Sequence, residues 1–114
     1  MALVLVAVIL TGCATTSSED RNFKTVSIIS DPPGAKIEVN GSYIGQAPIT
    51  TKVKCWPDDK VVVGTLTVKA LPSGANQYLQ QKVFKGPAYP FDPNHDVVPD
   101  TILFQMNLPT ANSN

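Results

Sequence analysis

Two cysteines and one histidine are the residues of this 114-residue chain that could carry nucleophilic or metal chemistry. A cysteine nucleophile needs a neighbouring base, and Cys55 could be combined with His95 and Asp96 in that way. No nucleophile motif surrounds Cys55, however, and no loop that would supply oxyanion donors is evident. A single histidine also excludes the usual zinc sites built from several histidines of one chain. We therefore expect no catalytic residues and predict that the protein is not an enzyme.

A short acidic segment is the candidate for a cation site. Residues 92–96 (DPNHD) place oxygen-bearing side chains at alternate positions, as the first half of a calcium loop does. The glycine required at the sixth position of such a loop is Val97, and the glutamate required at the twelfth is Leu103. The segment therefore fails as an EF-hand. A different cation site completed by Asp100 or Asp58 stays open, but a solvated loop with Asx turns is favoured, and no metal or cofactor is expected.

Aromatic side chains could form a platform on which sugar rings stack. The candidates are Tyr43, Trp56, Tyr78, Tyr89 and Phe91. Because aromatic residues of a small domain lie more often in its core, we expect most of them to be buried. Trp56 and Tyr89 are the candidates for contact with a glycan or another partner.

The other cysteine, Cys13, follows an uninterrupted apolar run from Met1 to Leu10. Ten residues are too few to span a bilayer, which takes about 20, but they fit the apolar region of a secretory signal. The run Leu10-Thr11-Gly12-Cys13 resembles the lipobox of bacterial lipoproteins, in which an aliphatic residue and two small residues precede a cysteine. The resemblance implies cleavage before Cys13, diacylglycerol on its sulfur and often an N-acyl chain such as palmitate. Several acyl chains make a stable membrane anchor.

A plain apolar first strand with a coincidental cysteine is the other interpretation of this region. It is disfavoured, because an uncharged apolar terminus of this length would promote aggregation of a soluble domain. Ala14 stands where an aspartate would resemble the inner-membrane retention signal of enteric bacteria. We therefore expect a lipid-anchored protein of the bacterial cell envelope that faces the periplasm or the surface, with the outer membrane favoured over the inner membrane.

Composition limits the remaining choices. The apolar fraction is 43%, but the first ten residues are all apolar, and from Cys13 onward it falls to about 38%, an ordinary value for a small single domain. Two domains with separate cores and a polytopic membrane protein are excluded. Nine basic residues balance nine acidic ones, so no strong field recruits nucleic acid or anionic lipid. Once Cys13 is lipidated, Cys55 has no intramolecular disulfide partner; we expect it to be buried, with an intermolecular disulfide as the alternative.

A polar tether at residues 14–21 leads into a pattern of short strands with no convincing helical periodicity. The expected strands are Thr25 to Ile29, Ala35 to Val39, Ser42 to Ile44, Ile49 to Lys54, Val61 to Ala70, Tyr78 to Lys85 and Thr101 to Leu108. Residues 86–100 are expected to form a long irregular loop docked through Tyr89, Phe91, Val97 and Val98. About seven short strands with regular turn signals predict an all-β protein, a small β-sandwich. The predicted organisation is a signal peptide at 1–12, the lipidated cysteine and tether at 13–22, the sandwich at 23–109 and a frayed tail at 110–114.

The turns of the first half follow a recognisable order. Two prolines and a glycine in Asp31-Pro32-Pro33-Gly34 end the first strand, and Asn40-Gly41 suits a type I′ hairpin turn. The stretch from Ser30 to Ile49 resembles the signature of PEGA domains: Ser-x-Pro-x-Gly-Ala, an alternating strand, an Asn-Gly turn, a glycine, and a proline before the next strand. The positions that would determine the fold are Pro32, Pro33, Gly34, Ala35, Asn40, Gly41, Gly45 and Pro48.

The resemblance covers Val26 to about Val53 and implies an extracytoplasmic structural or interaction module without catalytic residues. We therefore predict a lipid-anchored envelope protein that acts by binding, as an interaction or assembly module, with another envelope protein as its partner. The alternative is a glycan-binding module that contacts cell-wall or surface polysaccharide. Nucleic acid is not an expected partner.

Overall fold

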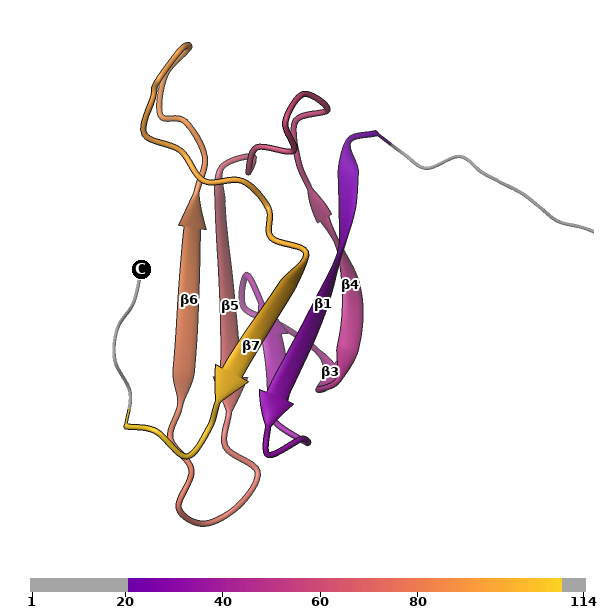
Figure 1. Ribbon diagram of the computed structural model, residues 1–114, viewed down its shortest axis with the longest axis vertical. Helices are drawn as coiled ribbons and strands as arrows, with labels where there is room; N and C mark the ends of the chain where they lie inside the picture. Colours follow the sequence, from indigo (N-terminus) through magenta and orange to yellow (C-terminus); the bar gives the residue numbers. More distant parts are fainter. Residues whose placement is uncertain (1–20, 110–114) are drawn as a thin grey trace, which may run out of the picture.

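Seven short strands, most of them alternating apolar and polar residues, build the computed structural model of this chain, which describes residues 21–109 (Figure 1). The strands are β1 (Phe23–Asp31), β2 (Lys36–Val39), β3 (Ser42–Gln46), β4 (Ile49–Lys54), β5 (Thr65–Leu71), β6 (Gln80–Lys85) and β7 (Thr101–Gln105). In this part of the chain there is no helix long and apolar enough to cross a membrane.

The strands form two sheets. One sheet has the order β4-β1-β7 and the other β3-β2-β5-β6. All neighbours are antiparallel except β1 and β7, which run parallel, with Ile29 paired to Leu103. The predicted all-β sandwich of about seven strands is therefore confirmed.

The core lies between the two sheets and is mainly aliphatic. Alternate residues of β1, β5 and β7 point inward, because successive side chains of a strand face opposite sides of its sheet. Phe104 of β7 is the largest fully buried side chain. The other buried apolar residues are Val26, Ile28, Ala35, Ile37, Ala47, Val53, Cys55, Val62, Leu66, Val68, Ala70, Val98, Ile102 and Met106.

The predicted strand from Val61 to Ala70 is wrong in its first third. The chain makes only isolated bridges at Val61 and Val62, and β5 begins at Thr65. Gly64 lies between them with a φ of 72°, a left-handed conformation that a regular strand cannot contain. Val62 is nevertheless buried, so the alternating pattern identified a core residue but not the end of the strand.

Other strand ends differ by one to three residues. β1 extends from Phe23 to Asp31, two residues beyond the prediction at each end, and β3 continues to Gln46. β2 and β6 begin one and two residues later than predicted. β7 ends at Gln105, yet Met106 after it is fully buried.

The turns of the first half have the backbone geometry that their residues favour. Asn40 and Gly41 have φ values of 49° and 86°, as a type I′ turn requires. Gly45 has a φ of 136°, and a Cβ there would lie 2.7 Å from Ile49 Cδ1. Asn40 also ties the hairpin to β5, because its Oδ1 accepts a hydrogen bond from Thr67 N–H at 2.8 Å. The bonds before Pro32 and Pro48 are cis.

Ser30 joins the end of β1 to the turn that follows. Its hydroxyl donates to the Pro32 carbonyl at 2.8 Å and accepts from Ala35 N–H at 3.3 Å. The side chain is buried, so no bulk water is available to replace these bonds. Ala35 and Ala47 then pair across the turn, since Ala47 N–H donates to the Ala35 carbonyl at 2.9 Å.

We expect Ser30→Ala to lower the free energy of unfolding by about 1–2 kcal/mol, because it leaves the buried Ala35 N–H without an acceptor. Urea denaturation measures the change. The matched control is Ser42→Ala, which removes a hydroxyl from an exposed position of β3 and should change stability by less than about 0.5 kcal/mol. Equal stabilities of the two variants would contradict the role assigned to Ser30.

Candidate interaction surfaces

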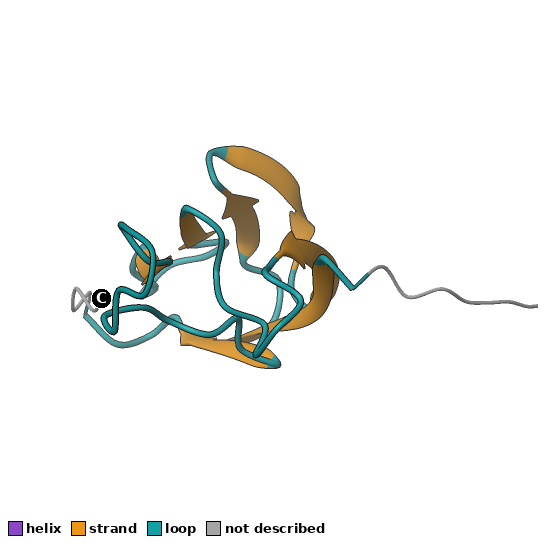
Figure 2. Cartoon of the chain, turned by 90° about the horizontal axis from the view of Figure 1, so that it is seen from above, coloured by secondary structure: helices purple, strands orange, loops and turns teal. Residues whose placement is uncertain are grey.

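Three segments that are distant in sequence meet at one end of the sandwich. Phe23 pairs with Lys54, and Thr65 pairs with Lys85, so the start of β1 lies at the same end as the β4–β5 and β6–β7 connections (Figure 1). Figure 2 looks down on this end and shows the connections crossing over it. We call residues 21–24, 54–64 and 85–100 together the capped end.

Hydrogen bonds join the segments of the capped end into one unit. Cys55 N–H donates to the Asn22 carbonyl at 2.8 Å. Val98 N–H donates to the Lys60 carbonyl at 2.9 Å, which links the two connections. Lys24 Nζ reaches the β6–β7 connection from β1, where it lies 2.8 Å from both the Val98 carbonyl oxygen and Asp100 Oδ1. The docking predicted for residues 86–100 therefore depends on Val98, which is buried, and on backbone bonds. The prediction was wrong for the other three residues expected to dock it, because Tyr89, Phe91 and Val97 are exposed.

Asp92 organises the protruding part of the β6–β7 connection. Its side chain is almost fully buried, and its carboxylate accepts hydrogen bonds at 2.9 Å from the backbone N–H groups of Ala88 and Asn94. These two hydrogen bonds hold the pKa of Asp92 below its usual range, and the bond from Ala88 N–H has the larger effect. Asp96 fixes the base of the connection, since its carboxylate accepts from Lys85 N–H and its own N–H donates to the Lys85 carbonyl, both at 2.7 Å.

The carboxylates of the acidic segment 92–96 thus bind backbone donors in a hydrogen-bonded loop. This is the arrangement of an Asx-type loop, the favoured of the two interpretations of the segment. Within residues 21–109, no group of three histidine, cysteine, aspartate or glutamate side chains is placed to hold a metal ion.

We expect acid to loosen this connection through Asp92. A carboxyl group whose pKa is lowered in the folded protein contributes stability above its ordinary pKa, near 3.8, and loses it as the pH falls through the lowered value. Amide exchange of Ala88 and Asn94, followed by NMR, should therefore accelerate below about pH 4, corrected for intrinsic rates. Asp92→Asn should show fast exchange at neutral pH as well. Unchanged protection in that variant would contradict the role of the carboxylate.

The three side chains that could form a nucleophilic triad are each engaged elsewhere. Cys55 is a free thiol and is buried, with its sulfur 4.0 Å from the Arg21 carbonyl oxygen. His95 Nδ1 lies 2.9 Å from the Asp92 carbonyl oxygen, and Asp96 binds the backbone of Lys85. The structure therefore does not bring Cys55, His95 and Asp96 together as a hydrogen-bonded triad.

The aromatic residues expected in the core are exposed. Trp56 and Tyr89 are 52% and 58% exposed, and Phe91 is completely exposed. These three lie at the capped end, whereas Tyr43 is on the edge strand β3 and Tyr78 precedes β6 at the opposite end. The expectation was wrong because strand positions, mostly aliphatic together with Phe104, fill the core, while most of these aromatics lie in or beside connections.

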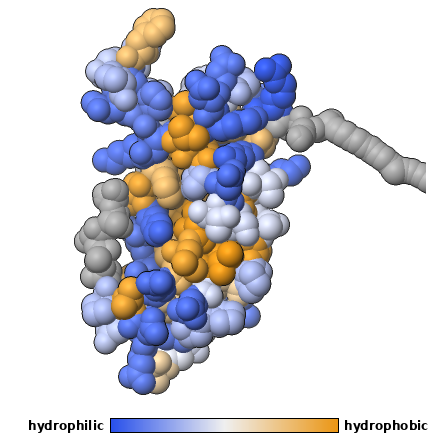
Figure 3. Space-filling view, viewed as in Figure 1, coloured by the Kyte–Doolittle hydropathy of each residue, from blue (hydrophilic) through white to orange (hydrophobic). Residues whose placement is uncertain are grey.

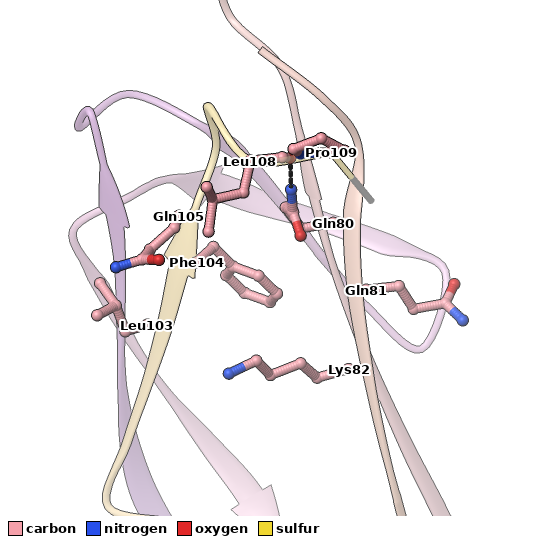
Figure 4. Close-up of a pocket in the computed structure, with 8 residues that line it drawn as sticks. All are labelled: Gln80, Gln81, Lys82, Leu103, Phe104, Gln105, Leu108 and Pro109. Carbon is pink, nitrogen blue, oxygen red and sulfur yellow. Dashed lines mark hydrogen bonds between the residues drawn. The ribbon is translucent and has the colours of Figure 1, made fainter. Parts of the chain in front are cut away.

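A groove separates the edge strands β6 and β7 (Figure 4). It has a volume of about 400 Å³. Lys82 extends across it, with Nζ 5.7 Å from the centre of the Phe104 ring, and Gln80 closes one end by donating from Nε2 to the Leu108 carbonyl at 2.8 Å. The groove is thus partly filled by the protein's own side chains.

A small apolar patch lies on the outer face of the β4-β1-β7 sheet. Ile29 and Leu103 are neighbours in the parallel register and are both exposed. Figure 3 shows apolar side chains on this face over β1 and β7, surrounded by polar ones. The patch is a second candidate surface for a partner, and no local sequence pattern indicates that these two residues lie side by side.

The predicted signal peptide at 1–12, Cys13 and the tail at 110–114 lie outside the described residues. Of the tether predicted at 13–22, only Arg21 and Asn22 are described. The motif positions of the first half, by contrast, lie in or next to the turns between β1 and β4. Among them, Gly34, Asn40, Gly41 and Gly45 have positive φ values. These residues act on the backbone, and the exposed side chains that could meet a partner lie elsewhere.

Comparison with known proteins supports the assignment of this segment. No curated protein and no solved structure matches the chain significantly. The family comparison finds one segment, which begins at the first residue of β1 and ends one residue after β4. Residues 23–55 match the PEGA domain, so the first four strands of this sandwich and the turns between them are its PEGA-like part.

Proposed function

We propose that this protein is a lipid-anchored component of the bacterial cell envelope whose β-sandwich binds a partner and catalyses no reaction. The observation that carries the proposal is that the reactive side chains are engaged in the fold: the only thiol outside the lipobox is buried, and His95 and Asp96 bind backbone groups. The domain also exposes large apolar side chains on an otherwise polar surface, among them Ile29, Leu103 and Trp56. The PEGA match of residues 23–55 supports a surface or interaction module.

The anchor in this proposal is a lipid on Cys13, carried through the lipobox Leu10-Thr11-Gly12-Cys13. Ala14 favours the outer membrane over the inner membrane. Cys13→Ser should move the protein from the membrane fraction to the aqueous fraction of disrupted cells. Detergent-dependent solubility of that variant would refute the lipid anchor.

The partner in this proposal is another envelope protein, and the patch of Ile29 and Leu103 is the surface we assign to it. A photoreactive residue in place of Leu103 should crosslink a discrete protein in intact cells, and the product should survive glycan digestion. A photoreactive residue in place of Tyr43, exposed on β3 of the other sheet, is the control and should give no such product. Equal products from both positions, or none from Leu103, would contradict this assignment.

Glycan binding is the second candidate, and the exposure of Trp56 and Tyr89 favours it. In that case the Cys13→Ser protein should sediment with isolated cell wall, and Trp56→Ala or Tyr89→Ala should abolish sedimentation. Tyr78→Ala, at the opposite end, is the matched control. Absence of sedimentation would leave the protein partner as the remaining candidate.

A further inference from the structure

Exposed aromatic residues are concentrated at the capped end. Of the eleven large hydrophobic residues exposed in the described part of the chain, five lie there, and four of these are aromatic. They are Phe23, Trp56, Tyr89, Phe91 and Val97. Figure 3 shows an apolar group at the tip of the β6–β7 connection, above a band of polar side chains, and this tip is the part that protrudes furthest at this end of Figure 1. The end therefore presents apolar side chains on a protrusion.

The protrusion is held in shape before any contact is made. Asp92 and Asp96 fix it through hydrogen bonds to Ala88, Asn94 and Lys85, all between 2.7 and 2.9 Å. Phe91 lies within it, completely exposed and with a φ of 64°. A bulky residue in this left-handed conformation is an outlier that the surrounding structure must maintain. Because the backbone at Phe91 is already held, insertion of its ring into an apolar medium requires no further ordering of the loop.

The chain also leaves the domain at this end. Asn22 is bonded to Cys55 at the capped end, and eight residues separate Asn22 from Cys13. Fully extended, eight residues reach no more than about 29 Å. A lipid on Cys13 would therefore hold the capped end, where the chain enters the domain, within about that distance of the bilayer.

The charges of the capped end are balanced. It contains five basic and five acidic residues, namely Arg21, Lys24, Lys54, Lys60, Lys85, Asp58, Asp59, Asp92, Asp96 and Asp100. Such a surface gains little from anionic lipid, but it does not need it, because Trp and Tyr side chains are favoured at the boundary between lipid chains and water. The aromatic side chains and balanced charges of the capped end therefore suit binding to neutral and anionic membranes alike.

We propose that the capped end docks on the membrane that holds the lipid anchor, with Phe91, Tyr89 and Trp56 entering the boundary between headgroups and acyl chains. This inference rests on the proposed lipid anchor. It gives the domain a fixed orientation, in which the apolar outer face around Ile29 and Leu103 stands beside the membrane contact and is open to a protein partner.

Trp56 is the only tryptophan of the chain, so its fluorescence reports on the capped end alone. The test uses the lipidated full chain reconstituted into vesicles of zwitterionic phosphatidylcholine, with or without brominated acyl chains. Brominated chains should quench Trp56. Phe91→Asn should reduce the ratio of docked to undocked protein about tenfold, as expected for withdrawal of one large apolar side chain from a membrane. Asparagine tolerates the left-handed backbone, and Phe91 has no buried contact, so this variant should unfold at no lower urea concentration than the wild type.

Tyr78→Asn is the matched control, since Tyr78 is an exposed aromatic residue at the opposite end, and it should leave the quenching unchanged. Lipidated protein whose Trp56 is not quenched would overturn membrane docking and leave the anchor intact. Quenching that is equal in wild type and Phe91→Asn would overturn the role of the protrusion. If added cell-wall polysaccharide protected Trp56 from a soluble quencher, and brominated lipid did not quench it, the capped end would be a glycan-binding surface instead. A mass spectrum showing no lipid on Cys13 would contradict the proposed function itself, and docking with it.

Discussion

Phe104→Ala is expected to lower the free energy of unfolding by about 3–5 kcal/mol, because it removes the largest fully buried side chain of the core. Phe104 is 1% exposed and lies between the two sheets, so alanine leaves a cavity that neighbouring strands can only partly fill. The substitution also removes the ring contacted by Lys82. A domain of this size is stable by about 5–15 kcal/mol in total, so the variant should unfold at a much lower urea concentration.

Leu103→Ala is the matched control for this prediction. Leu103 is the preceding residue of the same strand, but its side chain points to the outer face of the sheet. Its loss should change the free energy of unfolding by less than about 1 kcal/mol. A comparable destabilisation by both substitutions would mean that β7 does not present alternate residues to the core in this way.

The first half of the fold could be predicted almost completely, because its signals are local. Two prolines and Gly34 interrupt the ladder after β1, and Asn40-Gly41 selects a tight turn, so each strand between them is bounded by the residues next to it. Ser30 was part of the recognised pattern, but its two hydrogen bonds were not foreseen. They depend on how the turn folds back over the end of β1.

The second half was predicted less well, because its boundaries depend on contacts between distant residues. The alternation from Val62 to Ala70 correctly marks which side chains are buried, but it continues across Gly64, where the chain leaves the sheet. The parallel pairing of β1 with β7 brings together residues 74 positions apart, such as Ser27 and Thr101. No local periodicity contains that information.

The candidate surface was the least predictable feature. Counting aromatic residues as core holds for Phe104, which lies on the inner face of β7, but not for Tyr43 on the edge strand β3. Trp56, Tyr89 and Phe91 lie on connections, where a side chain is buried only if the loop folds inward. The loop around Phe91 instead uses Asp92 to bind its own backbone, and this holds the aromatic residue outside.

Gly86→Ala is expected to lower the free energy of unfolding by about 3 kcal/mol, for a reason that no turn pattern reveals. A Cβ at Gly86 would overlap the carbonyl oxygen of Val62, which belongs to the β4–β5 connection. A backbone atom cannot rotate away as a flexible side chain can, so the two connections must separate. Gly86 N–H also donates to the Gly64 carbonyl at 2.7 Å, and this bond would stretch.

Gly74→Ala tests whether the loss of stability is specific to the close approach of Gly86 to Val62. Gly74 has a side-chain atom of Gln77 as the nearest neighbour of an added Cβ, at an ordinary contact distance of 3.6 Å. Its substitution should alter stability by no more than about 0.5 kcal/mol. The two connections of the capped end approach each other at Gly86 and Val62. If alanine separates them, the amides of Asp96 and Val98 should exchange faster in Gly86→Ala than in the wild type, because both are hydrogen-bonded at the capped end. If both glycine variants kept those amides protected, the capped end would not depend on the close approach of its two connections.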